Sequence, residues 1–177
     1  MKRSIKNTEE AFLLLNELNA PSRLIIHAEL VKETAEEIIE RLSAYDIPLD
    51  YNYVRIAAVL HDAGKIIIAS ELSSPGKCHE EEGKRLLLRS GIDPALARCC
   101  LSHAGYNEMD CTLEELLVAL ADKLWKGKRE PELELMIIDR ISRLTGKERW
   151  DLYLKLDNGF EDIAEKGSQR LNRSLIG

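Results

Sequence analysis

The sequence has few aromatic residues, few glycines and prolines, and no long hydrophobic run. Aromatic residues make up 5% of the 177 residues, and there are 10 glycines and 5 prolines, which excludes the collagen-like and low-complexity classes. No apolar run approaches the roughly 20 residues that cross a bilayer, and the residues after Met1 lack the hydrophobic segment of a signal peptide. We therefore expect a cytoplasmic protein without a membrane partner.

Cysteine is also scarce, and its spacing does not suit the common cysteine-based sites. No two cysteines are separated by two residues, which excludes the C-x-x-C spacing of zinc and redox motifs. Cys99 and Cys100 are adjacent and poorly placed to bind one metal together. We expect reduced and mostly buried thiols. The four cysteines are Cys78, Cys99, Cys100 and Cys111.

Positive charge is in the minority, because 25 lysines and arginines face 31 aspartates and glutamates, for a net charge of −6. This balance argues against general binding to a nucleic-acid polymer or an anionic membrane, and it leaves room for a local basic pocket. Hydrophobic residues make up 45% of the chain, enough for a buried core. The length predicts a single domain over residues 1–177.

Hydrophobic residues recur at helical spacing nearly throughout, which predicts an all-α domain of about seven to nine helices. The run 66–68 is the one strand candidate, and because no partner strand is found we expect a buried loop or a helical turn there. Asp50 and Asp93 are expected to cap helices. The expected helices cover residues 8–18, 22–42, 50–64 and 79–90, two segments that begin at 93 and 112, and residues 130–146, 147–156 and 158–175.

All four histidines fall on apolar helix faces or at helix ends. His61 and Asp62 follow the apolar run 56–60, so the carboxylate would be buried there at a high cost unless it has a partner. An Asp that bonds to the nearby backbone, beside a packed core histidine, would also explain this pair. His27, however, lies within the apolar stripe of the second expected helix, and His79 and His103 also share faces with apolar residues.

A second carboxylate, Asp122, follows the six apolar residues 116–121 and shares a helical face with Trp125. An unpaired carboxylate is costly in such surroundings, and a bound cation would remove that cost. Histidines and aspartates that converge from several helices are typical of a metal site.

The order of these residues resembles the HD superfamily of metal-dependent phosphohydrolases. The resemblance covers about residues 21–130, whereas residues 131–177, where we expect C-terminal helices, resemble no family that we can name. The sequence after His103 lacks the Gly-Tyr-Pro element of cyclic-dinucleotide phosphodiesterases, which argues against that subtype. Four segments match in order, namely SRLIIH at 22–27, LHDAGK at 60–65, HEEEG at 79–83 and LADK at 120–123.

The resemblance implies a helical HD-domain fold that binds divalent metal, with two ions favoured and Asp62 as the bridging ligand. Fe or Mn is favoured, and Mg, Zn and Ni are also compatible with these ligands. The implied ligands of the first ion are His27, His61, Asp62 and Asp122, and those added for the second ion are His79 and His103.

The implied reaction is hydrolysis of a phosphate ester or anhydride in a nucleotide or similar small phosphorylated metabolite by a metal-activated water. Asp62 would orient the water, and Lys65 would offer a cation to the phosphate. Arg23, Lys126 and Arg129 are further candidates for phosphate contacts, and a solvated basic surface would explain them as well. The alternatives are a di-iron oxygenase with the same fold and a non-catalytic signalling module that keeps its metal. A homodimer through the C-terminal helices is compatible with the sequence.

Overall fold

The computed structural model describes residues 3–176 and is helical, which confirms the all-α prediction. Within these residues there is no strand, and no helix is long and apolar enough to cross a bilayer. Three short 3-10 helices lie between the α-helices, namely η1 (Ser43–Tyr45), η2 (Ala63–Ile66) and η3 (Ala69–Leu72). The α-helices are α1 (Thr8–Glu17), α2 (Ser22–Leu42), α3 (Tyr51–Leu60), α4 (His79–Arg89), α5 (Pro94–Ala97), α6 (Cys99–Gly105), α7 (Leu113–Leu124), α8 (Pro131–Thr145), α9 (Arg149–Glu165) and α10 (Gly167–Ile176).

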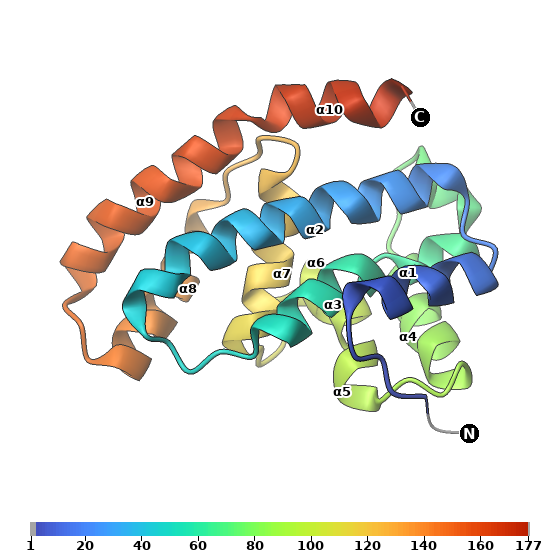
Figure 1. The fold of residues 1–177 in the computed structure, drawn as a ribbon, viewed down its shortest axis with the longest axis horizontal. Coiled ribbons are helices and arrows are strands. Elements are labelled where there is room, and N and C mark those ends of the chain that lie inside the picture. Colours follow the sequence, from blue (N-terminus) through green and yellow to red (C-terminus); the bar gives the residue numbers. More distant parts are fainter. Residues whose placement is uncertain (1–2, 177) are drawn as a thin grey trace.

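The long helix α2 and the helices α3 and α7 pack against one another at the centre of the molecule (Figure 1). The sequence of α2 has no internal glycine or proline, and its buried residues form a stripe from Leu24 to Leu42. Helix α7 begins with a capping box, in which the Thr112 hydroxyl accepts from the Glu115 N–H and the Glu115 carboxylate accepts from the Thr112 N–H. All but two residues of α7 are buried, as expected for a helix that is apolar on every side.

The C-terminal helices α9 and α10 pack against α2 (Figure 1). Charged pairs hold α10 in place, because Arg173 Nη1 lies 2.7 Å from Glu33 Oε2 and the buried Arg170 side chain bonds to Glu37. Lys166 Nζ also donates to Glu37, at 2.6 Å. The C-terminal end of the described chain is therefore fastened to the helix that carries His27.

The third helix ends earlier than predicted. It stops at Leu60 rather than at residue 64, and the chain tightens into η2 directly after His61 and Asp62. Ile66 belongs to η2, in agreement with a helical turn, but Ile67 is 48% exposed and not buried.

The boundary between the last two helices also differs from the prediction. The break lies at Lys166 and not near residue 157, so the turn-like sequence Asp157-Asn158-Gly159 falls inside α9. Gly159 faces the Arg41 side chain of α2, and the buried stripe of α9 continues on both sides of it. Packing against α2 thus outweighs the local preference for a turn.

The four cysteines have free thiols, and all except Cys78 are buried, as expected.

Candidate metal centre

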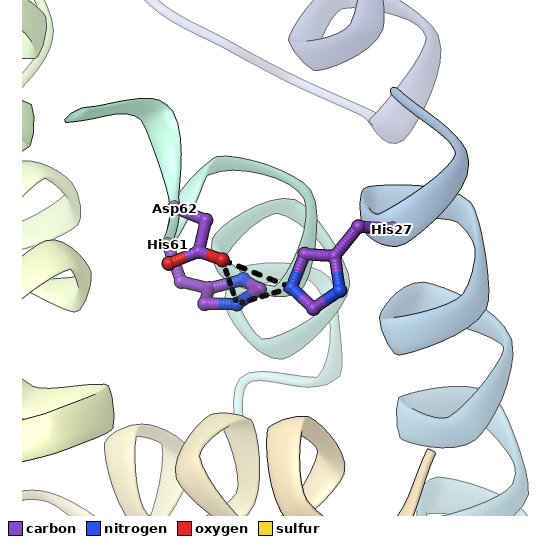
Figure 2. Close-up of side chains that lie close together, drawn as sticks. All are labelled: His27, His61 and Asp62. Carbon is purple, nitrogen blue, oxygen red and sulfur yellow. Dashed lines mark hydrogen bonds and ion pairs between the residues drawn. The ribbon is translucent and has the colours of Figure 1, made fainter. Parts of the chain in front are cut away.

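Histidine and aspartate side chains from five parts of the chain converge next to α2. Figure 2 shows His27, His61 and Asp62 pointing toward one another, with His27 reaching across from α2. His61 and Asp62 stand at the turn between α3 and η2, where the backbone leaves the helix. The other members of the cluster are His79 at the start of α4, His103 in α6 and Asp122 in α7.

Two glycines allow the His-Asp turn and α4 to approach each other closely. A Cβ atom on Gly64 would lie 1.7 Å from the carbonyl oxygen of His79, and one on Gly83 would lie 2.8 Å from the backbone nitrogen of Gly64. Both would overlap with backbone atoms, so η2 and α4 can touch only because neither residue has a side chain. This contact sets His79 beside Asp62.

The Asp62 carboxylate lies at the centre of the cluster, and each of its oxygens faces a different pair of imidazoles. Oδ2 lies 3.0 Å from His27 Nε2 and 3.7 Å from His61 Nε2. Oδ1 lies 3.1 Å from His79 Nε2 and 3.5 Å from His103 Nε2. Two nitrogen pairs therefore share one carboxylate, each pair on its own oxygen.

Asp122 supplies a second carboxylate beside the first nitrogen pair. Its Oδ1 lies 3.6 Å from His27 Nε2 and 3.5 Å from His61 Nε2. A lysine neutralises part of the charge of each carboxylate, since Lys65 donates to Asp62 Oδ2 at 2.5 Å and Lys123 donates to Asp122 Oδ2 at 2.9 Å.

Backbone carbonyl groups orient two of the imidazoles. His61 Nδ1 lies 2.9 Å from the Ala58 carbonyl oxygen, and His103 Nδ1 lies 3.2 Å from that of Cys99. A carbonyl oxygen can only accept a hydrogen bond, so Nδ1 carries the proton in both rings. The Nε2 atoms, which face Asp62, are thereby left as the metal-binding positions.

Burial and neighbouring charges set the protonation of the cluster. Burial would raise the pKa of Asp62, but the surrounding imidazoles, His61 first, hold that pKa well below its usual range. Burial would lower the pKa of His61, but Asp62 and Asp122 outweigh burial and raise it. Burial lowers the pKa of His103 to about 3, which keeps this imidazole neutral. The carboxylates of Asp62 and Asp122, which favour a proton on His61, would also favour a metal cation beside it.

Two buried polar atoms at the centre of the cluster have no hydrogen-bond partner among residues 3–176, namely Asp62 Oδ1 and His79 Nε2. They lie 3.1 Å apart, but their geometry does not form a hydrogen bond. Unpaired buried atoms of this kind are costly, and a cation between them would satisfy both. Ligand atoms from His27, His61 and Asp62 lie within 4.8 Å of one another, and so do those of Asp62, His79 and His103. The donor set therefore fits a divalent metal.

The cluster opens into a cavity of about 290 Å³, which all of its members except His61 line. Three of the predicted phosphate contacts, Arg23, Lys65 and Lys126, line the same cavity, and Lys123 joins them. Four cationic side chains line this one cavity, although the chain has a net charge of −6. Their positive charge favours the binding of an anion there.

Arg129, the fourth predicted phosphate contact, does not line this cavity. Its guanidinium lies 2.6 Å from Glu134 Oε2 and 2.6 Å from Asp157 Oδ1, and it also pairs with Glu161. Because three carboxylates of α8 and α9 already surround this cation, its role is to fasten those helices to the segment after α7.

Three further residues reach the site. Glu71 of η3 contacts His79 Nδ1, and Ser174 of α10 lines the cavity. Neither lies in a segment that the motif pattern singles out. The Trp125 ring meets the His27 ring edge-on, with centroids 5.1 Å apart, and its shared helical face with Asp122 is the signal that indicates this position.

Comparison with known proteins identifies a family. The model of the HD domain family matches residues 24–146, which include all six histidines and aspartates of the cluster and leave α9 and α10 outside. A curated protein of Thermoplasma volcanium, named tRNA (cytidine(56)-2'-O)-methyltransferase, is 29% identical over 168 residues. That alignment covers 86% of this chain and 42% of the relative, so the chain spans less than half of the relative's length. No solved structure matches the chain significantly.

Proposed function

The chain belongs to the HD domain family, and we propose that it is a metal-dependent phosphohydrolase. Its substrate is a phosphate ester or anhydride of a nucleotide or a similar small phosphorylated metabolite. The observation that carries the proposal is the position of Asp62, whose two oxygens each face a separate pair of imidazole nitrogens beside a cation-lined cavity. A carboxylate in such a position is suited to bridge two metal ions.

In this proposal both ions are held by side chains of the cluster, with Fe or Mn favoured and Mg, Zn and Ni also compatible. When bound, such ions supply hydroxide at neutral pH and neutralise charge on the phosphoryl oxygens. His27, His61 and Asp122 would hold the first ion, His79 and His103 would hold the second, and Asp62 would contribute to both positions.

The remaining tasks fall to side chains of the cavity wall. Asp62 is ionised and central, so it also orients the attacking water. The ammonium groups of Lys65 and Lys123, held next to the ligating carboxylates, bind the phosphoryl oxygens. Arg23 and Lys126 are exposed at the rim and form no salt bridge within residues 3–176. Two unpaired cations at the rim favour a substrate with more than one phosphate charge.

A small substrate is favoured over a nucleic-acid polymer. The cavity holds about 290 Å³, and outside it the chain is acidic overall. The Thermoplasma relative is named for a tRNA modification, so short RNAs with a terminal phosphate belong in the substrate screen beside mononucleotides and dinucleotides.

Metal analysis and a hydrolysis screen test the proposal. The purified protein is analysed for bound metals, and metal-free protein reloaded with Mn²⁺, Fe²⁺, Mg²⁺ or Ni²⁺ is assayed for release of phosphate. We expect metal-dependent hydrolysis by the wild type and none above background for Asp62→Ala. Asp151→Ala, which removes an exposed carboxylate on α9, is the control and should keep wild-type turnover. Wild-type turnover by a metal-loaded Asp62→Ala protein would overturn the proposal.

Oxygen uptake, measured beside phosphate release, separates the other activities that this ligand set allows. A di-iron oxygenase would consume oxygen with reduced iron and an alcohol or phosphonate substrate, and it would release no phosphate from the panel. A non-catalytic module would bind metal and show neither activity. Either result would replace the phosphohydrolase assignment.

A further inference from the structure

We propose that Glu71 is a positioning residue, which fixes the His79 imidazole and thereby sets the affinity of the second metal position. The inference rests on the proposed function, because it concerns one of the two metal positions described there. Glu71 lies in η3, between the His-Asp turn and α4.

Three hydrogen bonds hold the Glu71 carboxylate at the start of α4. Its Oε2 lies 2.5 Å from His79 Nδ1 and accepts the backbone N–H of His79 at 3.2 Å. Its Oε1 accepts the backbone N–H of Cys78 at 3.1 Å. The Glu71 side chain is 8% exposed, although residues 73–78 around it are exposed. The carboxylate is therefore fixed inside an otherwise open loop.

This contact determines which nitrogen of His79 can bind a metal. An ionised carboxylate can only accept, so Nδ1 carries the proton and Nε2 carries the lone pair. Nε2 then faces Asp62 Oδ1 at 3.1 Å, and it is one of the two unpaired buried atoms of the cluster. His61 and His103 are oriented by backbone carbonyl groups, whereas His79 depends on a charged side chain. A carboxylate partner also increases the basicity of the ligating nitrogen.

Glu80 does not compete for this role. Its Oε2 lies 3.6 Å from His79 Nδ1, which is too long for a hydrogen bond, and has no partner within the described residues. Glu71 alone therefore accepts the proton of Nδ1.

Gly76 makes room for the Glu71 carboxylate and offers a second way to test its role. A Cβ atom on Gly76 would lie 2.1 Å from Glu71 Oε1 and 2.2 Å from its Cδ. Those atoms end a flexible side chain, so the carboxylate would swing away while the backbone stays in place. Gly76→Ala therefore removes the contact with His79 and keeps the charge of Glu71.

Titration of the full-length, metal-free protein with Mn²⁺, followed by the electron paramagnetic resonance signal of free Mn²⁺, measures both positions. We expect two ions in the wild type and an affinity about 10–100-fold weaker at one position in Glu71→Ala. Gly76→Ala should act in the same direction. Glu71→Gln should lose less, because its amide oxygen can still accept from Nδ1. Glu81→Gln removes an exposed charge from α4, the helix that carries His79, and should change the affinity of neither position.

A double substitution separates positioning from a general structural effect. If Glu71 acts through His79, Glu71→Ala should cause no further loss of Mn²⁺ affinity in a His79→Ala background. Wild-type affinity at both positions in the folded Glu71→Ala and Gly76→Ala proteins would overturn the inference and leave the proposed function standing. Equal weakening of both positions would also overturn it. Failure of the wild type to bind Mn²⁺ or any of the other compatible divalent ions would instead overturn the proposed function, and the inference with it.

Discussion

Gly64→Ala tests whether the close contact between η2 and α4 holds the site together. In a relaxed turn this substitution stabilises a protein by about 0.4–1 kcal/mol, because alanine restricts the unfolded chain. Here the added Cβ would lie 1.7 Å from the His79 carbonyl oxygen and 2.6 Å from the backbone nitrogen of Gly83. Ordinary contacts begin at 3.4 Å, so the two backbone segments would have to separate by about 1.7 Å. We expect a net loss of about 1–3 kcal/mol from the free energy of unfolding.

The same separation would carry His79 away from Asp62. A displacement of about 1 Å in a catalytic group is enough to cost roughly 100-fold in rate. We therefore expect Gly64→Ala to lose at least about 100-fold in turnover, even under conditions in which the variant is fully folded.

Thermal unfolding followed by circular dichroism gives the stability, and phosphate release gives the turnover. For a chain of this size, the expected loss lowers Tm by about 2–12 °C. Gly105→Ala is a matched control, because a Cβ there would meet only Met109 Sδ, at an ordinary 3.6 Å. A Gly64→Ala protein with the Tm of Gly105→Ala and wild-type turnover would refute the packing argument.

Three other predictions follow from the charged side chains. Arg23→Ala and Lys126→Ala should each raise KM about 10-fold without changing Tm, and an unchanged KM in steady-state kinetics would remove them from the phosphate site. Arg129→Ala should do the reverse, leaving KM unchanged and lowering stability by about 1–3 kcal/mol, because its partners are carboxylates of α8 and α9. Burial would raise the pKa of Glu37, but the hydrogen bonds that its carboxylate accepts from Lys166 and Arg170 lower that pKa. The stabilisation by Glu37 is thus complete above its ordinary pKa of 4.5 and lost as pH falls through the lower folded-state pKa. Urea unfolding should therefore show Glu37→Gln to be about 1–3 kcal/mol less stable than wild type at pH 7. A difference that did not shrink as the pH falls below 4.5 would contradict this account.

The histidine and aspartate cluster could be predicted because each member is costly where the sequence puts it. His27 interrupts an apolar stripe, Asp122 follows six apolar residues, and Asp62 comes shortly after the apolar run 56–60 at the end of α3. A buried polar group needs a partner. The structure supplies partners from the other members of the cluster and from Lys65 and Lys123, except for Asp62 Oδ1 and His79 Nε2. Such positions are visible in the sequence, because helical periodicity alone shows that they face inward.

Residues whose position depends on tertiary packing could not be predicted in this way. Lys126 and Arg129 are three residues apart and look equivalent in the sequence, but only Arg129 meets carboxylates from α8 and α9. Glu71 lies in a segment that periodicity does not describe, and its burial depends on the loop before α4, where Gly76 leaves room for its carboxylate and the backbone N–H of Cys78 donates to it. The roles of Arg129 and Glu71 depend on neighbours distant in the sequence or on loop geometry, and periodicity carries neither kind of information.

Part of the cavity wall comes from outside the segment that carries the histidine and aspartate cluster. The family match ends at residue 146, yet Ser174 of α10 forms part of the cavity wall. Helix α10 reaches this position because Arg170 and Arg173 pair with glutamates of α2, the same helix that carries His27. The C-terminal helices therefore contribute to the cavity wall from outside the residues that the family model matches. If the chain is the proposed phosphohydrolase, the pairing of α10 with α2 helps to shape the cavity that its substrate would enter.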